Sequence, residues 1–112
     1  MRQQVAEFHS RYDGLSIDPD HIVVGPGSKI LIFSLLACFS SADVLLVTPS
    51  WVSYEPQAEM AGHNVLRIET SRATNWRLTP EKLNKACASR KDKSKACLLI
   101  LNYPGKSKIR EA

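Results

Sequence analysis

Short apolar segments alternate with segments of helical spacing along most of this chain. Four of the short segments predict strands, because they are rich in Val, Ile and Leu and are bounded by turn residues. These strands are expected at residues 21–24, 43–47, 64–70 and 96–101. Helices are expected at residues 2–13, 28–39, 53–61 and from residue 79 onward. The order α-β-α-β-α-β-α-β predicts an α/β fold with three layers and a mainly parallel sheet.

Residues that favour helix ends support these boundaries. Gly14 is expected to stop the first helix, and Gly62 to follow the third. Ser53 and Thr79 stand at the positions of N-caps, and Pro80 suits the first helical position after Thr79. The chain therefore carries helix-end signals that agree with its apolar pattern.

Several segments are apolar enough to predict complete burial. The helix at 28–39 is apolar nearly all round, which indicates a place beneath the sheet. The runs 43–47 and 96–101 are continuous, as in strands covered on both faces. Cys38 and Cys97 lie in apolar runs and are expected in the core. The three cysteines fit neither a disulfide framework nor a zinc site, which favours a reducing, cytoplasmic setting.

Composition and charge are those of an ordinary globular domain. Of the 112 residues, 44% are hydrophobic and 23% charged, and the net charge is +4. The longest uncharged run, residues 30–42, is shorter than the roughly 20 residues of a membrane span, and the N-terminus does not read as a signal peptide. The basic segments 90–95 and 106–110 contain no interleaved aromatic residues. We therefore expect neither a membrane nor a nucleic acid as a partner.

A glycine-rich turn joins the first predicted strand to the helix at residue 28. In Gly25-Pro26-Gly27-Ser28-Lys29 the chain turns sharply, and the first helical N–H groups have no partner inside the helix. Together with the helix dipole and Lys29 they make an anion site, most often for phosphate. The dinucleotide and Walker patterns both fail here, because Ile30 stands where each needs another residue. From these residues alone, a capped turn without a ligand is an equally good interpretation.

The predicted topology brings this turn to one edge of the sheet with two later segments. In a parallel sheet with right-handed crossovers, the carboxyl ends of the strands share an edge. Gly25–Lys29, Pro49–Trp51 and Asn102–Gly105 each follow a predicted strand. Ligands of open α/β sheets bind at that edge, so a ligand site is expected there. Taken alone, Trp51 is more typical of an aromatic that packs under a loop.

The order and spacing of several motifs resemble one enzyme family. The motifs are Gly27-Ser28-Lys29, Thr48-Pro49-Ser50-Trp51, Ala61-Gly62, Trp76-Arg77-Leu78-Thr79-Pro80 and Asn102-Tyr103-Pro104-Gly105. As an ordered set they resemble the cofactor-binding large domain of the fold-type I, pyridoxal-phosphate-dependent aminotransferases of class I/II, the aspartate-aminotransferase-like group. The resemblance implies that residues 1–105 are part of that large domain.

The same resemblance implies a cofactor and a reaction. Gly27, Ser28 and Lys29 match the turn that binds the phosphate of pyridoxal 5'-phosphate, and Trp51 matches the aromatic that stacks on the cofactor ring. The family transfers an amino group from an amino acid to a 2-oxo acid. Its members are generally dimers, which implies a homodimer or a heterodimer with a full-length relative.

The chain departs from the family pattern after Gly105. Lys106 stands where the family has the Asn that binds the cofactor's ring oxygen, and residues 106–112 read as a divergent basic tail. The Schiff-base lysine, the acid beside the ring nitrogen and the arginine for the substrate carboxylate have no counterparts. We therefore expect a truncated segment that is inactive alone, with no catalytic residue and no metal site. A non-catalytic regulatory copy and a stand-alone phosphate-binding α/β module are the alternative interpretations.

Overall fold

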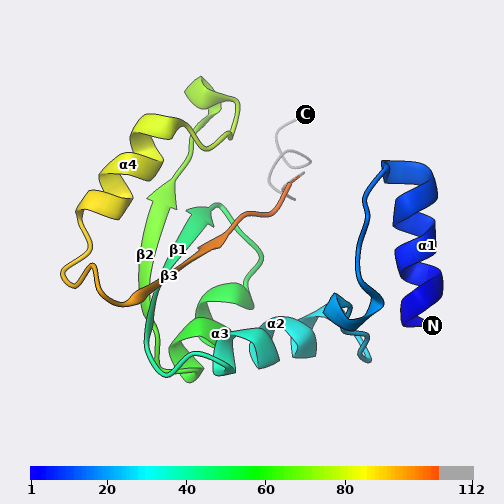
Figure 1. The fold of residues 1–112 in the computed structure, drawn as a ribbon. Helices are drawn as coiled ribbons and strands as arrows, with labels where there is room; N and C mark the ends of the chain where they lie inside the picture. Colours follow the sequence, from blue (N-terminus) through cyan, green and yellow to red (C-terminus); the bar gives the residue numbers. More distant parts are fainter. Residues whose placement is uncertain (104–112) are drawn as a thin grey trace. The chain divides into compact units, whose positions relative to one another are not determined.

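The computed structural model describes residues 1–103, which divide into two compact units (Figure 1). The first unit is Met1–Ser34 and the second begins at Leu35. Helix α2 (Ser28–Ala37) crosses this boundary. The predicted boundary at residue 105, the basic tail and Lys106 lie outside the described residues.

The first unit contains one full helix and a short turn of helix. Helix α1 (Arg2–Asp13) has the predicted bounds and ends where Gly14 adopts a left-handed conformation with φ 67°. The 3-10 helix η1 (Pro19–His21) follows, and the Asp18 carboxylate accepts a hydrogen bond from the Asp20 N–H at 2.9 Å. An irregular segment, which begins with extended Ile22, then leads to the start of α2.

The second unit is built on a parallel sheet of three strands. Strands β1 (Ala42–Thr48), β2 (Asn64–Glu69) and β3 (Ala96–Ile100) lie in the order β2-β1-β3. Because β1 is central, its side chains form most of the core, and Val44, Leu45 and Leu46 are at most 1% exposed. The three predicted strands in this part of the chain are therefore confirmed, with end points within one residue.

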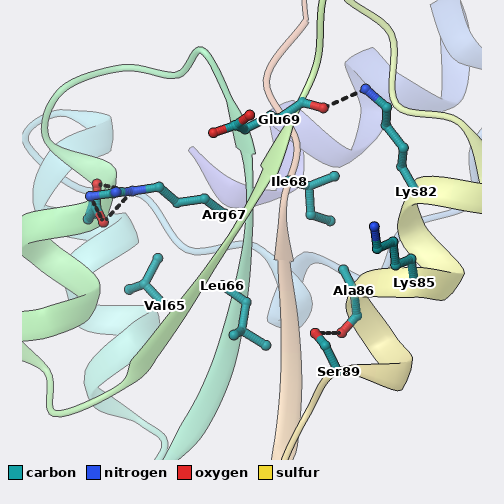
Figure 2. A pocket seen from close by; sticks show the side chains of 10 residues that line it. Val65, Leu66, Arg67, Ile68, Glu69, Lys82, Lys85, Ala86 and Ser89 are labelled. Atoms are coloured by element: carbon teal, nitrogen blue, oxygen red, sulfur yellow. Dashed lines mark hydrogen bonds and ion pairs between the residues drawn. The ribbon is translucent and has the colours of Figure 1, made fainter.

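Two helices cover opposite faces of this sheet. Alternate side chains of β2 point to the two faces, so Arg67 reaches Glu55 of α3 (Tyr54–Met60) while Ile68 points towards α4 (Pro80–Ala88), as Figure 2 shows. A short 3-10 helix, η2 (Arg72–Thr74), precedes α4. The three-layer α/β arrangement with a parallel sheet is confirmed.

The predicted caps differ in what their side chains do. The Thr79 hydroxyl accepts a hydrogen bond from the Lys82 N–H at 3.4 Å, and Pro80 occupies the first position of α4. Ser53 precedes α3 as expected, but its side chain makes no capping hydrogen bond. The Ser53 position is thus correct, whereas the capping interaction is absent.

The predicted strand at residues 21–24 is wrong. His21 belongs to η1, and residues 22–24 pair with no strand in the described part of the chain. An apolar segment becomes a strand only when a neighbouring strand completes its backbone hydrogen bonds, and no strand of the described sheet does so for this segment. Val23 is accordingly 76% exposed.

The predictions of complete burial are also corrected. Helix α2 ends at Ala37 rather than residue 39, and among its residues only Leu36 is buried. Alternate residues of β3 are exposed, so one face of this strand is uncovered in the described part of the chain. Cys97, on β3, and Cys38, which follows α2, are both exposed and do not belong to the core.

Candidate functional site

The glycine-rich turn has the sharp geometry that its sequence predicts. The Gly27 N–H donates to the Gly25 carbonyl at 2.8 Å, which closes a tight turn immediately before α2. Gly27 has φ +107°, a conformation that residues with a side chain rarely adopt, and the space where a Cβ would lie is open. Glycine is therefore required at this position by the backbone itself.

The start of α2 has the properties of an anion site. Helix α2 is 10 residues long, and its first turn contains no acidic residue. Its first N–H groups have no acceptor within the helix, and the dipole adds partial positive charge there. Ser28 and Lys29 are exposed at the same point. This end of α2 therefore fits a phosphate group.

The carboxyl ends of the three strands of the second unit lie level with one another. Thr48 pairs with Glu69, and Leu46 pairs with Ile100. The Thr70 N–H and hydroxyl both donate to the Thr48 carbonyl, at 2.8 and 2.6 Å, and so extend this alignment past the end of β2. The loops that follow β1 and β3 consequently leave from one edge of the sheet, as predicted for residues 49–51 and for the segment that begins at Asn102. Gly25–Lys29 follows no strand of this sheet, so its predicted place at the same edge is not established.

Trp51 lies in the loop that leaves this edge after β1. It comes three residues after Thr48, beyond a cis Thr48–Pro49 peptide bond, and is half-buried. A half-buried indole keeps part of its surface accessible, as a stacking residue needs. The stacking role that the resemblance implies for Trp51 stays a prediction.

A contact between two other loops at this edge was not anticipated from the sequence. The Leu78 N–H donates to the Tyr103 hydroxyl at 2.7 Å, which joins the segment before α4 to the segment after β3. Both residues lie in motifs that support the family resemblance, but neither motif indicates a pairing between them. Only the topology of the sheet brings the two segments together.

The four predicted cofactor residues are divided between the two units. Gly27, Ser28 and Lys29 belong to the first unit, and Trp51 belongs to the second. Because these residues belong to separate compact units, a single cradle made of all four stays a prediction. Residues 104 and 105 of the predicted edge lie outside the described part of the chain.

At the amino ends of the strands lies a polar cluster that the sequence reading missed. Asp43, at the start of β1, accepts hydrogen bonds from Asn64 Nδ2 at 3.0 Å and from Arg90 Nε at 2.8 Å. These bonds hold the pKa of the Asp43 carboxyl below its usual range, although burial opposes them. The signal for this cluster was a single carboxylate inside an otherwise apolar strand. Because it lies opposite the carboxyl edge, we assign it a structural role.

Residues 1–103 show no sign of a metal centre or of a membrane-spanning helix. No group of three or more His, Cys, Asp or Glu side chains in this range is arranged to hold a metal ion. None of the helices in the same range combines the length and the apolar character needed to cross a bilayer. A groove of about 850 Å³ follows β2 and α4, and its lining includes none of the four predicted cofactor residues.

Comparison with known proteins identifies the family. The family described as "Aminotransferase class I and II" matches residues 1–106, so the chain belongs to this family. An aspartate aminotransferase from a Bacillus species is 32% identical over 106 residues, and an asparagine–oxo-acid transaminase from Streptococcus mutans is 30% identical over the same length. Each alignment covers 93% of this chain and 26% of the relative. The chain thus spans about a quarter of the length of these relatives.

Solved structures agree with this assignment. A mutant aspartate aminotransferase from Thermus thermophilus superposes with a TM-score of 0.81 and 27% identity, covering 94% of this chain and 27% of that one. An aromatic aminotransferase from Pyrococcus horikoshii gives 0.79 and 29%, covering 94% and 28%. The chain is therefore a fold-type I aminotransferase fragment in both sequence and fold.

Proposed function

We propose that this chain provides the phosphate and ring contacts of a pyridoxal 5'-phosphate site in a class I/II aminotransferase. The observation that carries the proposal is the turn at Gly27, whose positive φ directs the chain into a helix that begins without an acidic residue. Family membership supports the choice of cofactor, because it makes a phosphorylated pyridine a more specific ligand than phosphate alone.

At the phosphate end, backbone N–H groups and two side chains bind the phosphate. The N–H groups at the start of α2 donate to the phosphate oxygens, and the Ser28 hydroxyl adds a further donor. Lys29 contributes a positive charge that favours the doubly charged phosphate. Gly27 lets the backbone approach closely, because its Cβ position is open. These groups bind and orient the phosphate without reacting with it.

At the ring end, Trp51 supplies a flat apolar face. Such a face stacks on a pyridinium ring and keeps water from one side of it. When bound, pyridoxal phosphate supplies the electron sink for amino-group transfer. Trp51 thereby fixes the plane of the ring, while the turn at residues 27–29 fixes its phosphate.

The proposed reaction of the whole protein is transfer of an amino group from an amino acid to a 2-oxo acid. We propose that residues 1–112 do not carry out this reaction by themselves. Lys29 belongs to the phosphate end, and no residue of the chain matches the lysine that the reaction needs at the cofactor's aldehyde carbon. The proposed contribution of this segment is therefore binding and orientation of the cofactor.

Equilibrium dialysis of pyridoxal phosphate against the full chain tests this function. We expect saturable binding that inorganic phosphate displaces, because both ligands occupy the start of α2. Replacing Lys29→Ala should weaken binding by about threefold to tenfold, as expected for loss of one charged contact. The matched control Lys91→Ala removes an exposed lysine from another part of the chain and should change nothing.

The same titration separates the proposal from its alternatives. Equal affinity for inorganic phosphate and pyridoxal phosphate would favour a stand-alone phosphate-binding module, because the ring then contributes nothing. Binding that phosphate does not displace, or that Lys29→Ala leaves unchanged, would contradict the phosphate role of residues 27–29.

A further inference from the structure

The outer edge of β2 carries backbone groups that the described sheet leaves unpaired. The N–H of Thr70, which directly follows β2, donates to Thr48 O. The even-numbered residues of β2 therefore direct their backbone N–H and C=O groups towards β1. The odd-numbered residues direct these groups away from β1. The carbonyl of Glu69, one of them, accepts a hydrogen bond from Lys82 Nζ at 2.6 Å outside the sheet. The backbone N–H and C=O groups of Val65 and Arg67 therefore point outward as well.

A groove follows this edge. It has a volume of about 850 Å³ and is bounded by β2 on one side and by α4 on the other (Figure 2). Leu66 and Ile68 provide apolar surface on the side facing α4, and Ala86 contributes from the helix. The groove thus combines unpaired strand backbone with apolar side chains, as sites for an added strand do.

The two walls of the groove differ in charge. On the α4 wall stand Lys82 and Lys85. The Lys82 ammonium group donates to a carbonyl, and neither lysine forms an ion pair with a described carboxylate. On the opposite wall Arg67 is paired with Glu55 at 2.7 Å, and the Glu69 carboxylate lies on the same side. Positive charge without a carboxylate partner is therefore confined to the α4 wall.

We infer that the outer edge of β2 binds an extended acidic peptide, which adds to the sheet as a further strand. Its backbone pairs with Val65 and Arg67, and its acidic side chains, at every second position, lie towards Lys82 and Lys85. The intervening side chains face the wall with Glu55 and Glu69, so they are neutral. This site involves none of the proposed cofactor residues and does not depend on the proposed function.

A labelled acidic peptide tests the inference directly. The probe is a peptide of about six residues with blocked ends, long enough for one strand, with Glu at alternate positions and Thr between them. Fluorescence anisotropy with the full chain at low salt should show saturable binding that weakens as salt is added. The same peptide with Lys in place of Glu should not bind. Equal binding of both peptides, or no binding of either, would overturn the inference.

Protein variants locate the binding site. Lys85→Ala should weaken binding by about twofold to fivefold, since it removes one exposed charge, whereas Lys93→Ala outside the groove should have no effect. Val65→Pro removes an outward N–H at an edge strand, where proline is tolerated, and should abolish binding. Unchanged affinity in Lys85→Ala and Val65→Pro would show that the peptide binds elsewhere and would contradict the inference.

A modified peptide tests the proposed strand pairing even if Val65→Pro does not fold. Methylating those backbone nitrogens of the peptide that would pair with β2 removes its donors and leaves its charge unchanged. Strand addition predicts loss of binding to the unaltered chain. Undiminished binding of the methylated peptide would show that charge alone holds it, and the proposed strand pairing would then be wrong.

Discussion

Arg90 Nε donates a hydrogen bond to Asp43 Oδ2 at 2.8 Å, across 47 positions of sequence. Both side chains are largely covered, with 10% of Arg90 and 6% of Asp43 exposed. Arg90 also donates to the carbonyls of Asp92 and Lys95, so it ties the loop after α4 to the start of the central strand. The ion pair therefore joins the connection that leads into β3 to the strand on which β3 is aligned.

This pair makes stability depend on pH in a defined direction. Hydrogen bonds from Asn64 and Arg90 lower the pKa of folded Asp43 below the 3.8 of a free side chain. As pH falls through 3.8, the unfolded chain therefore takes up the proton first, and acid favours unfolding. The contribution is fully present at neutral pH and is lost as the pH falls from about 3.8 towards the lower folded pKa.

Replacing Asp43→Asn tests this dependence. The variant should unfold at lower urea concentration than the parent at pH 7, because Arg90 loses its anionic partner. Between pH 5 and pH 2.5, the urea concentration at the midpoint of unfolding should fall less for the variant than for the parent. Urea titrations monitored by circular dichroism across this range provide the comparison. Parallel pH curves for parent and variant would show that Asp43 does not carry the effect.

The core of the second unit depends on the central strand. Leu45 is 1% exposed, in the middle of β1, and Leu45→Ala should reduce the free energy of unfolding by about 2–5 kcal/mol. Val52 is 82% exposed, so the control Val52→Ala should cost less than about 0.5 kcal/mol. Equilibrium urea unfolding measures both. A cost below about 1 kcal/mol for Leu45→Ala would contradict the packing of β1.

The outer edge of β3 is a second predicted place for association. Within the described residues β3 has one neighbour, and Leu99 is 43% exposed beside the exposed Cys97. Unprotected apolar edges of this kind pair with other chains. We predict association that rises with protein concentration and falls in Leu99→Lys, measured by sedimentation velocity under reducing conditions. If Val52→Lys, in the loop after β1 and outside the strands, lowers association equally, the edge is not responsible.

The sequence predicted those features of the fold that depend on local chemistry. The apolar run of β1 placed both ends of that strand within a residue, and the capping signals at Thr79 and Pro80 placed the start of α4. Gly27 was recognised as a turn residue, and its positive φ agrees. These features succeeded because propensity and the apolar pattern point to the same structure.

Features that depend on distant neighbours were harder to predict. Val23 and Val24 have the composition of a strand, but composition cannot show whether a neighbouring strand pairs with them. The exposure of Cys97 also depends on distant neighbours, because an apolar run does not reveal whether both faces of its strand are covered. Pairs such as Arg90 with Asp43, 47 positions apart, require the topology first.

Amino-group transfer by this chain alone should not exceed that of the cofactor in solution. Lys29 is assigned to the phosphate end, and no other lysine of the chain matches the one that moves the substrate's proton in the family. We predict equal rates with and without the chain for common amino acids and 2-oxoglutarate in the presence of pyridoxal phosphate, followed by loss of the amino acid. A reproducible excess that disappears in Lys29→Ala would make Lys29 a reacting group and would contradict its assignment.

The most direct test of the proposed cofactor site is tryptophan fluorescence during titration with pyridoxal phosphate. The chain has two tryptophans, Trp51 and Trp76, and each can be observed alone after the other is replaced by Phe. Stacking on Trp51 predicts that Trp76→Phe keeps saturable quenching that inorganic phosphate reverses, while Trp51→Phe loses most of it. Quenching of equal depth and affinity in Trp51→Phe would show that the ring does not stack on Trp51 and would contradict the proposed cofactor site.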